Sequence, residues 1–172
     1  FDVTNNHASL FSTQPAVSSA GALTFLAATD SVGVATVSVR VHDNGGIANN
    51  WVDTSAWQTF TIMVTGVNHA PSFAKGSDQA VLENAGPQTV GGWATAISAG
   101  PPDESSQVVS FDVTSNNGSL FSIQPAVSSS GVLTFLTATD SVGVATVSVR
   151  AHDNGGVANN GVDTSAWQSF TI

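Results

Sequence analysis

The chain has 172 residues, of which only 9 % are charged, and its formal net charge is −9 because it contains twelve acidic and three basic residues. This balance argues against nucleic acid and anionic membranes as partners, since both attract basic patches, and it suits divalent cations. The chain contains no cysteine, which excludes disulfides and thiolate metal sites. No run approaches the roughly 18 apolar residues of a membrane span, so we expect no membrane insertion.

Short alternating segments predict an all-β fold. Residues 34–42 alternate Ala and Val with polar side chains, which is the period of a strand with one buried face. In chain order, the next strands are expected at residues 55–67, 80–82, 88–97, 108–114, 119–123, 132–136 and 144–152. About seven short strands per repeat, separated by turns rich in Gly and Asn, are typical of an antiparallel Greek-key β-sandwich.

The chain contains two copies of one sequence with a period of about 110 residues. Residues 1–62 and 111–172 are identical at 51 of 62 aligned positions, and only the second copy is preceded by a stretch such as residues 63–110. We therefore expect the C-terminal part of a truncated repeat at residues 1–66 and a complete, or nearly complete, repeat at residues 67–172. Near-identical tandem units usually set length, spacing or valency.

Six segments share their order and spacing with one known pattern. They are Val67-Asn68-His69-Ala70-Pro71-Ser72-Phe73, Leu82-Glu83-Asn84, Pro102-Asp103-Glu104, Leu120-Phe121-Ser122-Ile123 with Gly131-Val132-Leu133, Asp140, and Ala151-His152-Asp153-Asn154-Gly155. These segments resemble cadherin-type repeats, specifically the cadherin-like tandem repeats of large bacterial surface adhesins. The first is similar to the inter-domain linker, with Asn68-His69 where the family usually has two aspartates. The second lies where the family has a calcium-binding glutamate.

The resemblance implies calcium at the linker, held by carboxylate and carbonyl oxygens. The acids expected to face the linker are Glu83, Asp103, Glu104 and Asp140, and Asn68 would add an amide or backbone oxygen. The alternative is that these acids are solvated or cap turns by accepting backbone N–H bonds.

A second cation candidate comes from the residues themselves. An Asp-Asn-Gly-Gly loop begins at Asp43 and again at Asp153, and ten residues later it is closed by Asp53 and Asp163 respectively. Side-chain and carbonyl oxygens of such a loop could surround a cation. The alternative is a turn stabilised by the Asp and Asn side chains.

Catalysis is not expected. The serines lie in turns and strands without a Gly-x-Ser-x-Gly motif or a partnered His–Asp set. Asp103 and Glu104 are adjacent, so on a strand they would point to opposite faces. His42 and His152 should face solvent beside an aspartate, and His7 is replaced by Asn in the second copy, so a transition-metal site is not expected either.

The predicted function is structural or adhesive. We expect an extracellular or cell-surface module that extends or connects a bacterial adhesin or fibre, with neighbouring repeats of the same chain as partners and calcium as a stiffening ion. One alternative is a self-assembling subunit of an extracellular filament or sheath, which would be a homopolymer. Another is a carbohydrate-binding accessory module, for which Trp51, Trp57, Trp93 and Trp167 are the available aromatic residues.

The truncated first repeat lacks the strands that residues 68–110 supply to the second. A seven-strand sandwich without two or three of its strands exposes a hydrophobic cleft and unpaired backbone edges. Either the sequence is part of a longer continuous chain, or another chain completes this half-domain by strand addition.

Overall fold

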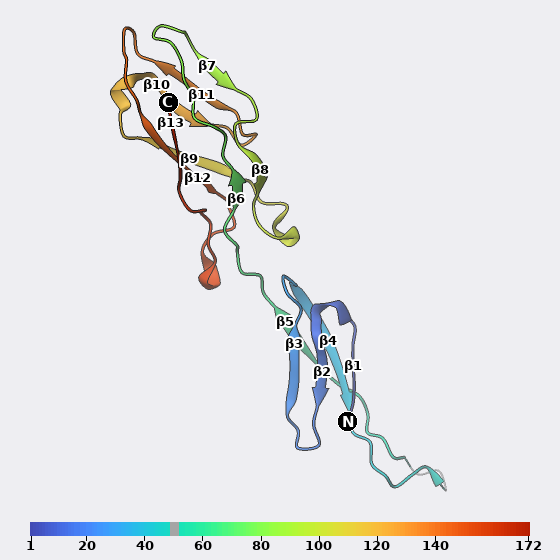
Figure 1. The fold of residues 1–172 in the computed structure, drawn as a ribbon. Coiled ribbons are helices and arrows are strands. Elements are labelled where there is room, and N and C mark those ends of the chain that lie inside the picture. The colour runs from blue at the N-terminus through green and yellow to red at the C-terminus, as the bar shows by residue number, and fades with distance from the viewer. Residues whose placement is uncertain (49–51) are drawn as a thin grey trace. The chain divides into compact units, whose positions relative to one another are not determined.

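The computed structural model describes residues 1–48 and 52–172, and it confirms an all-β fold with several antiparallel sheets (Figure 1). The helical elements of the described residues are 3-10 turns of three residues, such as Ala8–Leu10 and Gly118–Leu120. The chain divides into two compact units, Phe1–Gly66 and Val67–Ile172, here called unit 1 and unit 2. In the described part of the chain, no helix has the length and apolar character needed to cross a membrane.

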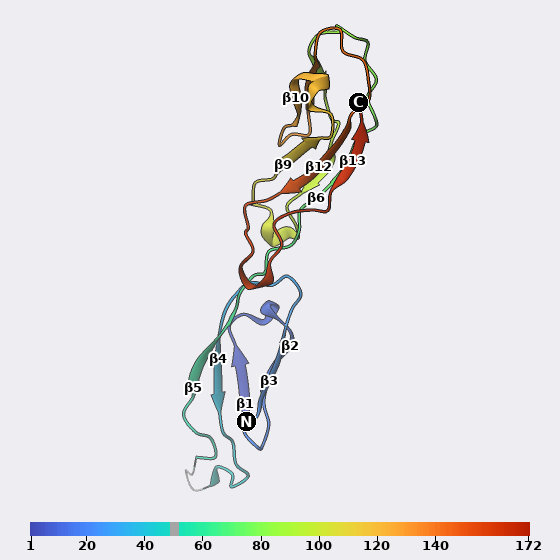
Figure 2. The same cartoon turned by 90° about the vertical axis from the view of Figure 1, so that its left-hand side faces the viewer.

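Unit 1 contains two small antiparallel sheets. Its strands are β1 (Asp2–Asn5), β2 (Phe11–Val17), β3 (Leu23–Ala27), β4 (Gly33–Arg40) and β5 (Gln58–Val64). One sheet has the order β1-β4-β5 and the other pairs β2 with β3; Figure 2 shows β4 between its two neighbours. The alternation predicted for residues 34–42 is confirmed in β4 for Ala35 and Val37, which are buried together with Leu10, Phe11 and Ile62. Val41, expected on the same buried face, lies beyond the end of β4 and is 48 % exposed.

Unit 2 repeats this arrangement and adds to it. Its strands are β6 (Ser72–Ala74), β7 (Gln88–Val90), β8 (Thr95–Ser98), β9 (Ser110–Ser115), β10 (Phe121–Val127), β11 (Leu133–Thr137), β12 (Thr146–His152) and β13 (Gln168–Thr171). The sheets have the orders β13-β12-β9, β10-β11-β7 and β6-β8. The sheet β13-β12-β9 corresponds in sequence to β5-β4-β1 of unit 1, and β10-β11 corresponds to β2-β3.

The core of unit 2 is larger because three additional strands contribute to it. Phe73, Trp93 and Ala94, from the stretch that unit 1 lacks, pack with Leu133, Phe135 and the apolar residues of β12. The rings of Trp93 and Phe170 lie with their centroids 4.4 Å apart, and Phe73 meets Phe111 edge to face at 5.1 Å. Aromatic pairs of this geometry stabilise a core beyond the area that they bury.

Three of the predicted strands differ from the structure. Residues 80–82 are not a strand, and the single strand expected at residues 88–97 is two strands, β7 and β8, because a turn at Gly91-Gly92 separates them. The strand expected at residues 119–123 begins only at Phe121, since residues 118–120 form a 3-10 turn. A serine between two apolar residues has the two-residue period of a strand over a short stretch. This pattern occurs both at the start of a strand and in a tight turn, so it does not distinguish the two.

Candidate metal centre

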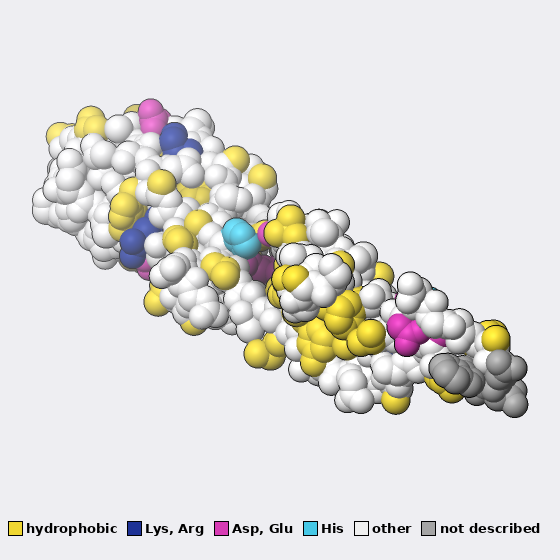
Figure 3. Space-filling model, turned by 90° about the horizontal axis from the view of Figure 1, so that it is seen from below, with side chains coloured by type: hydrophobic (Ala, Val, Ile, Leu, Met, Phe, Trp, Pro, Cys, Tyr) yellow, Lys and Arg dark blue, Asp and Glu magenta, His cyan; other side chains and the backbone are white. Residues whose placement is uncertain are grey.

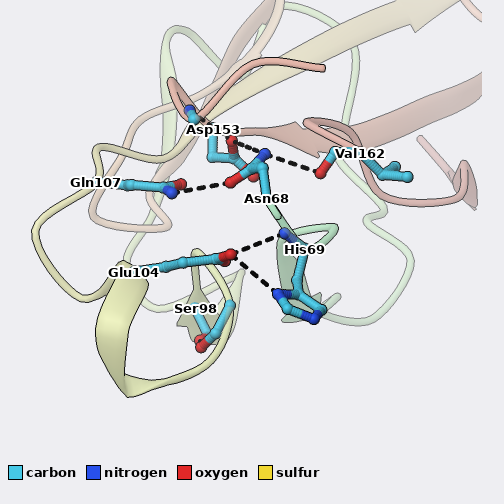
Figure 4. A network of polar contacts seen from close by, with 9 residues as sticks. Asn68, His69, Ser98, Glu104, Gln107, Asp153 and Val162 are labelled. Carbon is cyan, nitrogen blue, oxygen red and sulfur yellow. Dashed lines mark hydrogen bonds and ion pairs between the residues drawn. The ribbon is translucent and has the colours of Figure 1, made fainter. Parts of the chain in front are cut away.

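Three segments of unit 2 that are distant in sequence meet around Asn68 and His69 (Figure 4). Asn68 and His69 lie in the extended stretch before β6. Glu104 is the last residue of the 3-10 turn Pro102–Glu104, and Asp153 directly follows β12. Figure 4 shows the Glu104 side chain reaching the backbone and ring of His69, and the Asp153 side chain reaching the side chain of Asn68, from different elements.

The side chain of Asn68 is held by three hydrogen bonds. Its Nδ2 group donates to Asp153 Oδ1 and to the backbone carbonyl of Val162, both at 2.9 Å, and its Oδ1 accepts a bond from Gln107 Nε2 at 2.8 Å. The Asn68 carbonyl also accepts a bond from the backbone N–H of Val162 at 2.9 Å. Asn68 is therefore fixed to the end of β12 and to the loop before β13.

His69 is held by one carboxylate. Its backbone N–H donates to Glu104 Oε1 at 2.9 Å, and its ring Nδ1 lies 3.0 Å from the same oxygen. Glu104 is itself positioned by the short turn, where its N–H bonds the Pro101 carbonyl and its own carbonyl accepts from Gln107 N. One oxygen of Glu104 thus ties the start of unit 2 to the turn.

Three buried oxygen atoms of this cluster remain unused. Glu104 and Asp153 are 5 % and 1 % exposed. Glu104 Oε2, Asp153 Oδ2 and Gln107 Oε1 have no hydrogen-bond partner among the described residues. Buried polar atoms are normally satisfied, and an uncompensated carboxylate is costly to bury, so these oxygens call for a positively charged or donating partner. Two carboxylate oxygens and one amide oxygen are the ligand types that Ca²⁺ prefers.

Two glycines allow the backbone to pass close to this cluster. A Cβ atom at Gly100 would collide with Glu104 Oε2, and one at Gly155 would collide with Asn68 Oδ1. Because any other residue would displace these side chains, both glycines are required for the observed arrangement.

The acids that were expected to bind calcium together at the linker lie in different places in the structure. Glu104 and Asn68 lie in the cluster, whereas Asp103 is exposed on the same turn. Asp140 bonds Asn84, which donates to Asp140 Oδ1 at 2.9 Å and accepts from its N–H at 3.1 Å. Glu83 lines a pocket with Val142 and Val144, near the start of β12. Since seven strand residues span about 20 Å, Asp140 and Asp153 lie at opposite ends of β12.

The two Asp-Asn-Gly-Gly loops have the hydrogen bonds of aspartate-stabilised turns. Asp43 Oδ1 accepts from Gly45 N at 2.7 Å, and Asp153 Oδ1 accepts from Gly155 N at 2.9 Å. The N–H of Asp43 donates to the Asp53 carbonyl, and the N–H of Asp153 donates to the Asp163 carbonyl, both at 2.9 Å.

The carboxylate of the second aspartate of each loop lies next to a histidine ring. Asp53 Oδ2 lies 3.2 Å from His42 Nε2, and Asp163 Oδ2 lies 3.6 Å from His152 Nε2. His42 and His152 were each expected to lie beside an aspartate, and that aspartate is the one that follows the loop: Asp53 for His42 and Asp163 for His152.

Gln107 and the Val162 carbonyl were not expected in a candidate site. Gln107 is a lone amide in a Ser- and Val-rich stretch, and a backbone carbonyl has no signature in the sequence. Asn68 and Asp153 were expected in separate candidate sets, although they bond across 85 residues.

The exposed tryptophans have intramolecular partners. The guanidinium of Arg40 lies 4.7 Å from the centre of the Trp57 ring, and that of Arg150 lies 4.7 Å from the Trp167 ring. Trp93 is buried and donates its indole N–H to the Ser77 carbonyl at 3.0 Å. Trp51 lies outside the described residues.

Comparison with known proteins found no match: no protein-family model, no curated protein and no solved structure matches this chain. Within residues 1–48 and 52–172, no group of three or more His, Cys, Asp or Glu side chains is placed to hold a metal ion. The cluster at Asn68 contains three residues of these types, Glu104, Asp153 and His69, and they are not placed as such a group.

Proposed function

We propose that the chain is a structural module of an extracellular or cell-surface bacterial adhesin or fibre, built from tandem Greek-key β-sandwich repeats of about 110 residues. The near-identity of the two copies and their matching strands support a role in spacing or connection, and the resemblance to cadherin-like repeats points the same way. Its partners in this role are neighbouring repeats of the same chain, and we propose no catalytic activity.

The tryptophans offer limited support for carbohydrate binding as the alternative. Trp93 is buried, and an arginine lies over one face of the ring in both Trp57 and Trp167, which are 43 % and 46 % exposed. A sugar-binding platform needs an aromatic face that is free to stack on the ligand, and Trp51 lies outside the described residues.

We further propose that the Asn68 cluster binds one calcium ion. The observation that carries this proposal is the pair of buried carboxylate oxygens, Glu104 Oε2 and Asp153 Oδ2, that lack partners among the described residues. Asp153, Glu104 and Gln107 would hold the ion, which would neutralise two buried negative charges. The ion would stiffen the stretch before β6, because Asn68 and His69 are bonded to the same carboxylates.

A thermal melt of the 172-residue chain in calcium and in a chelator tests this proposal. At a calcium concentration of about 100 times the dissociation constant, the free energy of unfolding of unit 2 should rise by about 2.7 kcal/mol. This corresponds to a shift of several degrees in Tm for a domain of this size. Glu104→Gln and Asp153→Asn should each remove the shift, since each deletes one charged ligand.

The matched control is Asp43→Asn, which changes the same residue of the same turn in unit 1. Asp43 is exposed, and among the described residues of unit 1 no asparagine or glutamine amide bonds its carboxylate. This variant should keep the calcium shift. Identical melts of the parent chain in calcium and in chelator would remove the calcium proposal and leave the structural role untouched.

A further inference from the structure

Uncharged polar groups make up much of the surface of the chain. On the face drawn in Figure 3, most of the surface is white, the colour of the backbone and of uncharged polar side chains, and the charged side chains are scattered. Lys75 is the one lysine of the sequence, so the side chains that a modifying enzyme could reach are chiefly hydroxyls and amides. Attachment of a sugar to asparagine requires the sequence Asn-x-Ser or Asn-x-Thr on a surface loop.

One such sequence is present in the 172 residues, Asn117-Gly118-Ser119. It lies in unit 2 between β9 and β10, where Gly118 begins a 3-10 turn. Gly118 and Ser119 are exposed and Asn117 is half-buried, while the next residue, Leu120, belongs to the core. The motif is therefore at the surface, in a turn that is anchored by a buried leucine.

The side chain of Asn117 is oriented for reaction at its amide nitrogen. Ser119 Oγ donates a hydrogen bond to Asn117 Oδ1 at 2.9 Å. Of the two N–H groups of Nδ2, one donates to the Val144 carbonyl at 3.4 Å, and the other has no partner among the described residues. The bond from Ser119 stabilises the negative charge that Oδ1 gains when Nδ2 acts as a nucleophile. The second N–H is the position at which a sugar can be attached.

The equivalent turn of unit 1 has the same conformation and lacks the asparagine. His7 has φ −141° and ψ 64°, and Asn117 has φ −133° and ψ 70°. Ala8 and Ser9 are exposed, and His7 is half-buried. In unit 1, β5 pairs along β4 as far as Val64, and the turn is accessible with this strand in place. The accessibility of the turn is therefore a property of the repeat.

We propose that Asn117 is an acceptor for N-linked glycosylation, with an activated sugar diphosphate as the donor. Asn117 Nδ2 forms a bond to C1 of the sugar, and the bond between C1 and the diphosphate oxygen breaks. The diphosphate leaves with the bonding electron pair and with its nucleotide or lipid carrier, and the proton lost from Nδ2 passes to a base of the transferase. The remaining N–H still reaches the Val144 carbonyl. This inference goes beyond the proposed structural role and does not depend on calcium.

Glycosylation of the folded 172-residue chain tests the proposal. One reaction contains UDP-glucose and a soluble N-glycosyltransferase, and the other contains a lipid diphosphate oligosaccharide and a membrane-bound oligosaccharyltransferase. We expect one sugar group per chain, located on Asn117 by peptide mass spectrometry. The added mass, a single hexose or a whole oligosaccharide, distinguishes the two carriers. Absence of the modification in both reactions, or its presence only on other residues, would overturn the proposal.

Substitutions within the motif separate the acceptor from the residue that orients it. Asn117→Gln should abolish the modification. Ser119→Ala should slow it by at least about tenfold, because the hydrogen bond to Oδ1 is lost, and Ser119→Thr should restore the rate because it keeps the hydroxyl. Ser119 is exposed, so both of its variants should fold, which their thermal melts verify. An unchanged rate in Ser119→Ala would contradict the positioning role of Ser119.

The turn of unit 1 provides a matched gain-of-function test. His7→Asn together with Ala8→Gly gives unit 1 the same three-residue sequence in the same turn. We expect a second sugar group on this variant. Its absence, with Asn117 modified, would overturn the inference that the turn presents the motif. Modification of Asn117 in the unfolded chain alone would overturn it as well, because the folded turn would then hide the amide.

Discussion

One aspartate illustrates how residues of the same type acquire different properties in the two copies. Asp43 and Asp153 occupy equivalent positions of the two copies and accept the same turn hydrogen bond from the glycine two positions later. Only Asp153 is buried, because Asn68 and the stretch before β9 pack against its turn. The chemistry at this position therefore depends on a neighbour that is 85 residues away.

Asp2 provides a pH test at the same scale. The hydrogen bond from Arg40 Nε, at 2.7 Å, lowers the pKa of the Asp2 carboxyl below its ordinary value of 3.8, and the positive charge of Arg40 adds to the effect. A lowered folded-state pKa means that the contribution to stability is present above pH 3.8 and is lost as the pH falls through the folded-state pKa. We expect Arg40→Gln to return the pKa to about its ordinary value, measured by NMR titration of the carboxyl carbon.

Lys75→Gln is the control for that measurement, since it removes a positive charge from unit 2. It should leave the pKa of Asp2 unchanged. An Asp2 pKa that stays low in the Arg40 variant would mean that another group depresses it.

At the scale of elements, β3 and β11 share the segment Leu-Thr-Phe-Leu and differ in what lies beside them. β11 is an inner strand between β10 and β7, while β3 has β2 on one side. The strand itself is predictable because its residues favour an extended backbone. Whether this strand lies inside a sheet or at its edge depends on β7, which pairs with β11 and begins 45 residues before it.

The matched substitutions Leu133→Ala and Leu23→Ala measure this difference. Leu133→Ala should lower the free energy of unfolding of unit 2 by about 2 to 5 kcal/mol, because it opens a cavity in a packed core. Leu23→Ala should cost unit 1 only about 1 kcal/mol, because the side chain is already partly in water. Denaturant unfolding followed by NMR signals of each unit gives both values. Equal losses would show that β3 is covered in solution.

The strands also show where the local sequence pattern predicts secondary structure correctly and where it does not. The predicted strands at residues 34–42 and 144–152 are confirmed as β4 and β12, since a strand with one buried face repeats every two residues. The strand expected at residues 88–97 is wrong, because Gly91-Gly92 turns the chain between β7 and β8. Residues 80–82 are apolar enough for a strand, yet they line a pocket without joining a sheet.

At the scale of the whole molecule, the two units have cores of different size. The buried core of unit 1 is formed by five residues, Leu10, Phe11, Ala35, Val37 and Ile62, in the described part of the chain. That of unit 2 adds Phe73, Trp93 and Ala94 to residues of the repeated segment. Because stability grows with the apolar surface that a unit buries, unit 1 should be the less stable of the two.

Amide hydrogen exchange of Val37 and Val147 tests this expectation. Both valines stand in the same local sequence, Ala-Thr-Val-Ser, so their intrinsic exchange chemistry is the same, and both are fully buried in equivalent strands. The Val37 amide should exchange at least about tenfold faster, as expected for a unit less stable by 1.4 kcal/mol or more. Equal protection of the two amides would mean that the two units open together or are equally stable.

The all-β class, the duplication and most strand positions are predictable from the sequence, because they depend on residues that are neighbours along the chain. The sequence also identified Asn68, Glu104 and Asp153 as candidate ligands, although in two separate sets. Only the tertiary structure brought these three together with Gln107 and placed Glu83 and Asp140 elsewhere, since that depends on which end of a strand each loop joins. The tertiary structure likewise decided that identical residues are buried in β11 and exposed in β3, because burial is a property of the segment that covers them.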